Sequence, residues 1–105
     1  MVSSQGFRDL RAYQMAFDLA MKIFQESKKF PAEERYSLTD QIRRASRSVA
    51  ANIGEGYRKK RYPKMFVSKM ADADGEATET QVLDRFRLRV WLPSKNNTSG
   101  NASRL

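Results

Sequence analysis

One run in the middle of the chain constrains the fold more than any other, because its apolar and small residues recur at alternating steps of four and three. The spacing 4, 3, 4, 3, 4 is typical of a helical seam that faces a neighbouring helix, and it is carried by Leu38, Ile42, Ala45, Val49, Asn52 and Gly56. We predict a helix that begins near Ser37, where Ser37-Leu38-Thr39-Asp40 has the form of a capping box, and that stops near Gly56.

Two further segments have the periodicity of amphipathic helices. Residues 9–29 carry apolar side chains at steps of three and four, with Asp9 as the expected N-terminal cap and Pro31 as the stop. The other segment starts at Pro63, a residue favoured in the first helical turn, and persists at least to Val82. The sequence therefore predicts an all-α chain.

The last part of the chain follows another pattern. Residues 85–90 read Arg-Phe-Arg-Leu-Arg-Val and alternate with a period of two, which is typical of a strand. A single strand would have no ladder partner in an otherwise helical chain. Pro93 and the polar run 94–101 are predicted to be disordered.

Composition excludes several classes of protein. A chain of 105 residues is expected to form one domain. It has no cysteine and no histidine, which excludes disulfides, Cys/His zinc sites and nucleophiles that depend on a histidine base. No apolar run approaches the roughly 20 residues of a membrane span. We expect a cytoplasmic protein that is not an enzyme and has no cofactor.

The net charge of +8 favours an acidic partner such as RNA or DNA. Residues 85–105, however, carry five Lys/Arg and no Asp/Glu. More than half of the excess charge thus lies in the last fifth of the chain, which weakens the case for nucleic acid if that segment is peripheral.

Five runs, in one order, resemble those of a known bacterial family. They are Phe7-Arg8-Asp9-Leu10, residues 30–39 (FPAEERYSLT), Gln41-Ile42-Arg43-Arg44-Ala45, residues 48–56 (SVAANIGEG), and Gly75-Glu76 followed by Glu79-Thr80-Gln81. Over residues 7–82 the chain is similar to the four-helix-bundle proteins encoded in intervening sequences of 23S ribosomal RNA. The resemblance implies an up-down four-helix bundle that assembles into a homo-oligomeric ring, with a pentamer favoured. It also implies a relation to the accessory protein of diversity-generating retroelements, and hence nucleic acid and a reverse transcriptase as partners.

The chain departs from the family pattern after Val82, where a full fourth helix would be expected. We therefore predict a helical bundle domain over residues 1–82, with three clear helices and the fourth degraded or absent. Residues 83–105 are predicted to be an atypical basic, partly disordered tail. A change of reading frame near Val82 is our hypothesis for its origin.

Two groups of basic residues are candidates for binding phosphates. Arg43, Arg44 and Arg47 lie within about one and a half turns of the predicted middle helix, where they either bind phosphate or form ion pairs inside the bundle or between subunits. The run Arg58-Lys59-Lys60-Arg61, flanked by Tyr57 and Tyr62, either holds a nucleic-acid backbone or is a solvated loop. It is the better nucleic-acid candidate of the two.

Other singled-out residues have structural interpretations. Asn52 is expected to form a hydrogen bond in the seam, and Glu55 to pair with an arginine of another helix or subunit. Gly56 is expected to end its helix, whereas Gly75 predicts a close helix crossing. Glu79 and its acidic neighbours are expected to be solvated or to pair with the arginines, because bundle di-metal sites need a histidine that is absent here.

The sequence thus predicts a non-enzymatic oligomer, either an accessory or scaffold protein that binds RNA or DNA phosphates, or an assembly module that binds protein only. Three helices of a four-helix fold leave an apolar groove uncovered. We expect parts of the Phe17/Phe24, Ile42/Val49 and Phe66/Met70 stripes to line it. A second subunit is expected to cover it.

Overall fold

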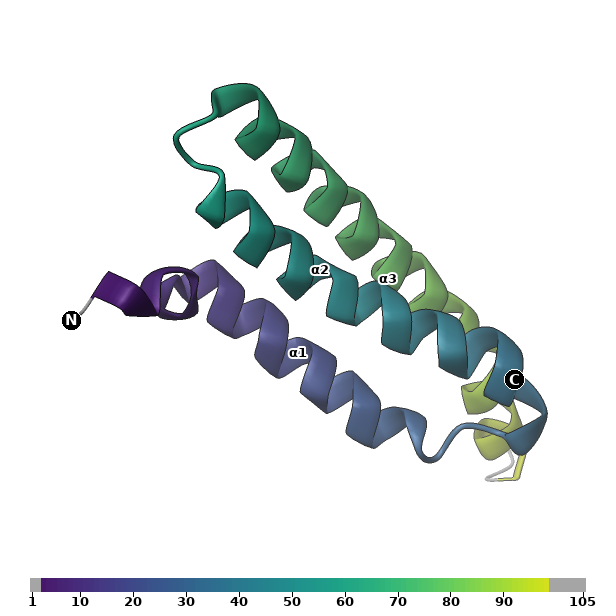
Figure 1. The fold of residues 1–105 in the computed structure, drawn as a ribbon. Coiled ribbons are helices and arrows are strands. Elements are labelled where there is room, and N and C mark those ends of the chain that lie inside the picture. Colours follow the sequence, from purple (N-terminus) through teal and green to yellow (C-terminus); the bar gives the residue numbers. More distant parts are fainter. Residues whose placement is uncertain (1–2, 99–105) are drawn as a thin grey trace.

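The computed structural model describes the backbone of residues 3–98 and the side chains of residues 6–89 (Figure 1). Three α-helices account for most of this chain: α1 (Arg11–Ser27), α2 (Asp40–Arg58) and α3 (Pro63–Thr98). Short helical turns complete it: η1 (Ser3–Asp9), η2 (Ala32–Glu34) and η3 (Arg35–Thr39). The described part of the chain holds no strand, which confirms the all-α prediction. None of its helices is long and apolar enough to cross a membrane.

The three helices run up, down and up, with α2 between the other two (Figure 1). A buried cluster of Leu38, Ile42, Ala45 and Leu83 ties α2 to α3, and Ile23 and Phe30 pack against it from α1 and the segment that follows. Ile42 is 1% exposed. This cluster lies where α1 turns into α2, and we call that end of the three-helix body the packed end.

The helix starts differ from the predicted caps. The residue before α1 is Leu10, in extended conformation and without a side-chain hydrogen bond, so Asp9 does not cap the helix. Before α2, the Glu34 carboxylate accepts hydrogen bonds from the Leu38 backbone N–H (3.3 Å) and the Ser37 hydroxyl (2.7 Å). The prediction of a capping box that starts at Ser37 is therefore wrong. Because Ser37 already lies inside the helical turn η3, the carboxylate that precedes the turn caps it.

Two glycines also behave differently from the prediction. Gly56 does not end α2, which continues to Arg58. It is buried, and a Cβ there would collide with the Met70 methyl and lie 3.1 Å from the Lys69 Cβ. A Cβ on Gly75 would meet nothing within 4 Å. The close crossing of α2 and α3 is therefore at Gly56 and not at Gly75.

The predicted strand over residues 85–90 is helical in the structure, because α3 continues through it to Thr98. Extending an existing helix requires no new nucleus, and Arg and Leu are strong helix formers. An i,i+3 contact of 2.7 Å, from the Arg87 Nε to the Asp84 carboxylate, supports this helix. The run predicted to be disordered is helical over 94–98, and 99–101 lie outside the described residues. We call residues 84–98 the α3 extension.

Candidate functional site

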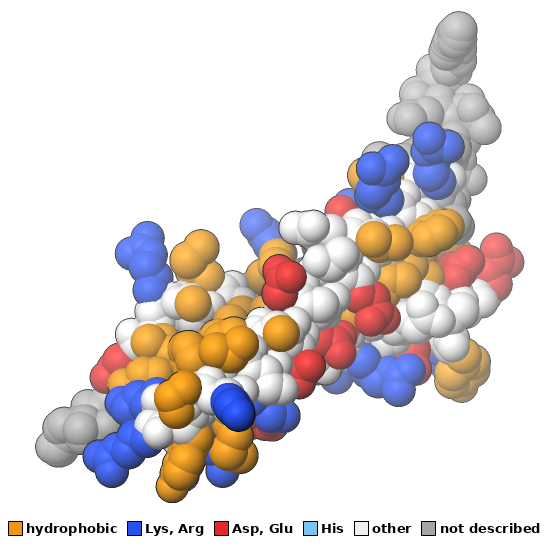
Figure 2. Space-filling view, turned by 90° about the horizontal axis from the view of Figure 1, so that it is seen from above, with side chains coloured by type: hydrophobic (Ala, Val, Ile, Leu, Met, Phe, Trp, Pro, Cys, Tyr) orange, Lys and Arg blue, Asp and Glu red, His pale blue; other side chains and the backbone are white. Residues whose placement is uncertain are grey.

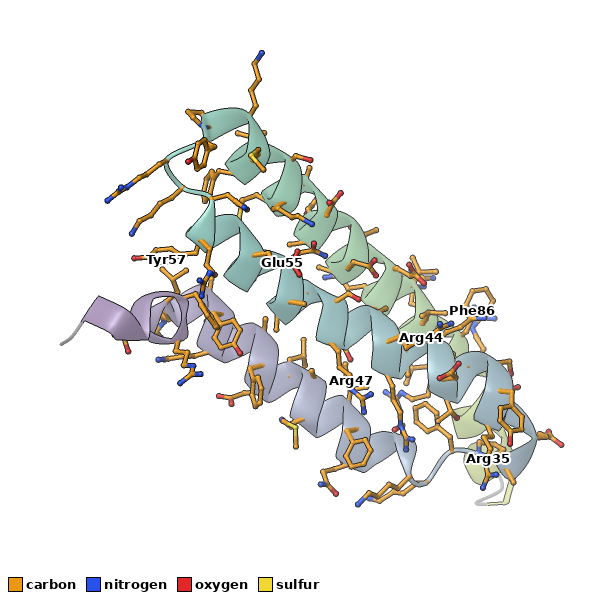
Figure 3. The ribbon with its side chains drawn as sticks, viewed as in Figure 1. Arg35, Arg44, Arg47, Glu55, Tyr57 and Phe86 are labelled. Atoms are coloured by element: carbon orange, nitrogen blue, oxygen red, sulfur yellow. The ribbon has the colours of Figure 1, made fainter. Side chains whose placement is uncertain are left out.

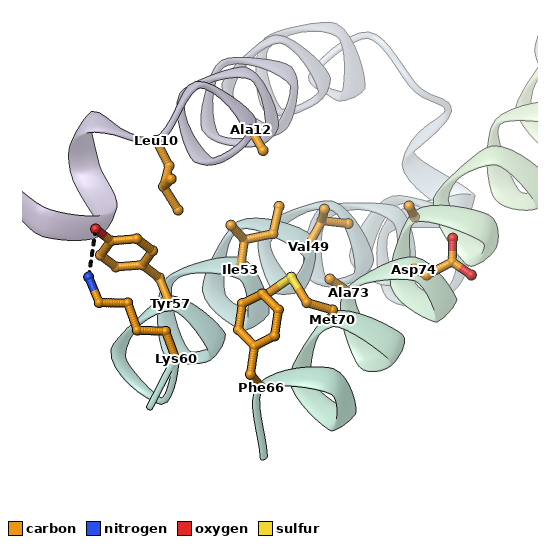
Figure 4. Close-up of a pocket in the computed structure, with 11 residues that line it drawn as sticks. Leu10, Ala12, Val49, Ile53, Tyr57, Lys60, Phe66, Met70, Ala73 and Asp74 are labelled. Carbon is orange, nitrogen blue, oxygen red and sulfur yellow. Dashed lines mark hydrogen bonds between the residues drawn. The ribbon is translucent and has the colours of Figure 1, made fainter. Parts of the chain in front are cut away.

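The exposed run Arg58-Lys59-Lys60-Arg61 comprises the last residue of α2 and the turn that leads to α3. Backbone hydrogen bonds shape it, from the Lys59 N–H to the Gly56 carbonyl (2.9 Å) and from the Tyr62 N–H to the Lys59 carbonyl (2.8 Å). The Lys60 Nζ donates to the Tyr57 hydroxyl (2.9 Å) and lies 4.0 Å from the centre of the Tyr57 ring (Figure 4). The structure thus brings the four predicted basic residues together beside an aromatic ring.

Further cations lie at the same end of the molecule (Figure 2). The Phe7 ring packs directly on Gly54, where a Cβ would lie only 3.2 Å from it. This contact holds η1, which includes Arg8, against the end of α2. Lys64 is exposed in the first turn of α3. We call this set the basic end; its members are Arg8, Arg58, Lys59, Lys60, Arg61 and Lys64.

The arginines of α2 do not form one stripe. The Arg43 Nε donates to the Ser27 hydroxyl (2.7 Å), and its guanidinium lies 4.7 Å from the centre of the Phe24 ring. Arg47 lies 5.7 Å from the same ring, whereas Arg44 faces another way and pairs with its helix neighbour Asp40 at 3.7 Å (Figure 3). Arg43 is half-buried between α2 and α1, so its geometry favours a packing role.

The remaining motif residues take part in local contacts. The Asn52 side chain donates to the Ser48 carbonyl of its own helix (3.0 Å). Glu55 accepts from Lys69 of α3 (2.9 Å), so its partner within the chain is a lysine and not the expected arginine. The hydrogen bond and the charge of Glu55 raise the pKa of Lys69. Glu79 is exposed, and no described cation lies within ion-pair distance of it.

An open apolar groove of about 600 Å³ lies between the three helices at the end opposite the core (Figure 4). The predicted Val49, Phe66 and Met70 line it, but Phe17, Phe24 and Ile42 do not. The prediction named the wrong residues at α1, because Ala12 and the preceding Leu10 line the groove in place of the Phe17/Phe24 stripe. It also missed a second α2 stripe whose i,i+4 spacing was a usable signal. The full lining is Leu10, Ala12, Val49, Ile53, Tyr57, Lys60, Phe66, Met70, Ala73, Asp74 and Ala77.

These features define an all-helical protein that presents an exposed basic turn and an open apolar groove. The chain belongs to the family described as 23S rRNA-intervening sequence protein, whose model matches residues 8–97. This confirms the family resemblance, and the match continues past Val82. No curated protein and no solved structure matches the chain. The relation to the retroelement accessory protein, and the domain boundary at residue 82, stay predictions.

Within the described residues, no group of three or more acidic side chains is arranged to hold a metal ion.

Proposed function

We propose that the chain is a non-catalytic, oligomeric accessory protein that binds the phosphate backbone of RNA or DNA through its basic end. In this proposal its helices are three members of a four-helix-type bundle, with the groove in the place of the fourth. The family description, which refers to 23S rRNA, supports a role beside nucleic acid. A ring of five subunits and a reverse-transcriptase partner, both suggested by resemblance, belong to the same proposal.

The exposed turn Arg58–Arg61 carries the proposal. Four consecutive cations project from a short turn without an acidic residue between them, so no neighbouring carboxylate in the run competes with a phosphate. Tyr62 is 60% exposed at its edge and offers a ring face on which a base can stack. Since the contacts are to phosphates and ring faces, we expect binding that is largely independent of sequence.

Salt dependence tests the proposal. We would measure fluorescence anisotropy of labelled RNA and DNA oligonucleotides of unrelated sequence across a salt series. Changing Arg58, Lys59, Lys60 and Arg61 to Ala should reduce the slope of log K against log salt by about 0.7 to 0.9 per lost phosphate contact.

The matched control removes four cations from the other half of the molecule: Lys22, Lys28, Lys29 and Arg35. It changes the net charge equally and should leave most of the binding. If the wild-type protein fails to bind at low salt, or the control loses as much binding as the loop variant, the proposal is wrong.

A second candidate function is protein assembly alone. The groove favours it, because a large apolar surface open to water is typical of a binding face. The packing of Arg43 against Phe24 and Ser27 favours it too, since it removes one candidate phosphate ligand. Light scattering that shows an oligomer, together with no salt-sensitive nucleic-acid binding, would select this function over the first.

A further inference from the structure

We propose that copies of the chain join head to tail, with the outer face of α3 in one copy packed against an aromatic face of α1 in the next. Because the two faces differ, each copy offers one and receives the other. A single repeated contact of this kind closes into a ring, and it is compatible with five subunits. The inference rests on the oligomer of the proposed function and does not depend on nucleic-acid binding.

The outer face of α3 carries an exposed stripe on the side away from α2, where Figure 3 shows Phe86. Its residues recur at steps of four and three, the spacing that a helix presents to a neighbouring helix. The larger apolar members lie open to water, with Val67 62% and Phe86 58% exposed. We call this face the outer stripe; its members are Val67, Ala71, Gly75, Thr78, Val82 and Phe86.

α1 carries a second exposed face, on a flank that does not line the groove. Its residues also recur at steps of four and three. Phe17 is 48% exposed, and its ring lies 6.0 Å from that of Tyr13. We call this face the aromatic face; its members are Tyr13, Phe17, Met21 and Phe24. The two outer helices thus each present an apolar face to water, and such faces are typical of binding surfaces.

The levels of the two faces match. Leu83 of α3 and Phe24 of α1 both contact the first turn of α2, so they lie at the same level of the three-helix body. About two turns back along each helix, Phe17 lies level with Gly75 to within about one residue. Copies that are related by rotation about an axis along the helices keep their levels. Phe17 of one copy therefore meets Gly75 of the next.

Shape is complementary at this level. The outer stripe is narrowest there, because Gly75 is flanked by the small side chains of Ala71 and Thr78. A Cβ on Gly75 would meet nothing within 4 Å inside its own chain. The protruding Phe17 ring therefore faces the shallow middle of the outer stripe, in the manner of a ridge that packs into a groove.

Charge is complementary as well. Residues 70–84 of α3 carry five Asp/Glu and no Lys/Arg. The aromatic face, in contrast, is bordered by cations that lie within 6 Å of the centre of the Phe24 ring. They are Lys28 (4.9 Å), Arg43 (4.7 Å) and Arg47 (5.7 Å). An acidic helix edge and a cationic aromatic face attract each other, whereas two copies of either would repel.

One pair of opposite charges shares a level. Arg47 lies one turn of α2 from Arg43 toward the open end, and Glu79 lies one turn of α3 before Leu83. Glu79 borders the outer stripe, next to Thr78. Among the described residues, neither Arg47 nor Glu79 has an ion-pair partner within the chain. The head-to-tail contact pairs Arg47 of one copy with Glu79 of the next.

Side-chain size at position 75 tests the contact by light scattering. Gly75→Leu fills the place of the Phe17 ring and should reduce the mass of the assembly to about half of the wild-type value or less. Gly75→Ala is the matched control and should leave the mass unchanged. Both residues form helices better than glycine does, and the single chain has room for them, so neither variant should unfold.

A charge exchange tests the same contact independently. Arg47→Glu and Glu79→Arg each oppose like charges between copies and should each lower the mass of the assembly. The combined variant carries both changes in one chain and restores opposite charges at every contact of the ring. Its mass should therefore return to the wild-type value.

Cross-linking distinguishes a head-to-tail contact from a closed pair, because the chain has no cysteine of its own. A chain with both Met21→Cys and Val82→Cys is treated with a short bis-maleimide. We expect a ladder of species at three and more times the 12.1 kDa chain mass. The control pairs Val82→Cys with Leu19→Cys, which lies on the opposite flank of α1, about 160° around the helix, and it should give no ladder.

The outcomes separate this inference from the proposed oligomer. A wild-type monomer near 12.1 kDa would overturn both. An oligomer whose mass resists Gly75→Leu and both charge reversals would overturn the contact between α3 and α1 and leave the oligomer standing. A cross-linked product that stops at two chains, or a ladder that is equally strong in the Leu19→Cys control, would do the same.

Discussion

The packed end and the open end of the three-helix body are built from the same helices, yet only one of them forms a core. At the packed end, Ile23 of α1 and Phe30, which follows that helix, pack against Leu38, Ile42 and Leu83. At the open end, the α2–α3 turn is short and basic and leaves Ile53 and its neighbours lining a groove. An apolar helical stripe therefore becomes a core only where a further segment covers it, and the open end lacks that segment.

The largest expected effect comes from truncating one isoleucine to alanine at each end of the three-helix body. Ile42→Ala removes a fully buried side chain and should lower the free energy of unfolding by about 3 kcal/mol. Ile53→Ala, at the groove, should cost about 1 kcal/mol because water already reaches its surroundings. Urea unfolding of both variants measures the difference, and equal losses would contradict the distinction between the ends.

The same pair sharpens the comparison if it is measured at several protein concentrations. Where a second copy fills the groove, the cost of Ile53→Ala should grow with protein concentration, because assembly stabilises the folded chain by mass action. The cost of Ile42→Ala relative to wild type should change much less.

Two arginines that share one aromatic ring give the next effect. Arg43→Met keeps most of the side-chain volume but loses the hydrogen bond to Ser27, and should cost about 1.5 kcal/mol. Arg47→Met loses only a more distant contact with Phe24 at an exposed position, and should cost about 0.5 kcal/mol. Thermal or urea unfolding checks both, and a larger loss at Arg47 would contradict the packing role of Arg43.

Substituting two glycines should give smaller effects on stability, and the two effects should have opposite signs. Gly56→Ala should destabilise by about 1 kcal/mol, since the Met70 methyl can swing aside but the Lys69 Cβ must shift with its helix. Gly75→Ala has open space and should stabilise by about 0.5 to 1 kcal/mol through its higher helix propensity. Circular dichroism melts of the two variants should therefore move in opposite directions from the wild type.

The smallest effect is the pH dependence of the exposed Glu55–Lys69 pair. The raised pKa of Lys69 means that its contribution to stability is complete below the unfolded-state pKa, 10.5 for an ordinary lysine. The contribution is lost as pH rises through the folded-state value. The stability difference between wild type and Glu55→Gln should therefore shrink in alkaline solution. A difference that widened there would contradict this direction.

The sequence predicted most of the fold because its signals were local. The seam of α2 and Pro63 in the first turn of α3 predicted these two helices to within a few residues. The runs that resemble the family predicted how the helices are arranged. The prediction of a strand at 85–90 was wrong. An alternating pattern over only six residues also fits a helix, and the two cannot be distinguished until the preceding helix is known to continue. Residues 85–90 are helical because α3 propagates through Leu83 into this segment.

The candidate site was predicted only in part. A run of four cations at 58–61 marks an exposed turn on its own, so the composition of the basic end could be predicted. Which arginine of α2 meets Phe24, and which glycine meets Met70, depends on the rotation and spacing of two helices. Residues 43, 44 and 47 all look alike in sequence, but each is about 60° or more from at least one of the others around the helix. Tertiary packing alone separates them.

The α3 extension has a consequence for spectroscopy. The only tryptophan of the chain, at position 91, lies on this segment, outside the three-helix body. Indole fluorescence therefore reports on the extension, while far-ultraviolet circular dichroism is dominated by the other helices. Coincident unfolding curves from the two signals would mean that extension and body unfold as one cooperative unit. A fluorescence transition at lower denaturant would mean that the segment detaches first, as a separate unit of lower stability.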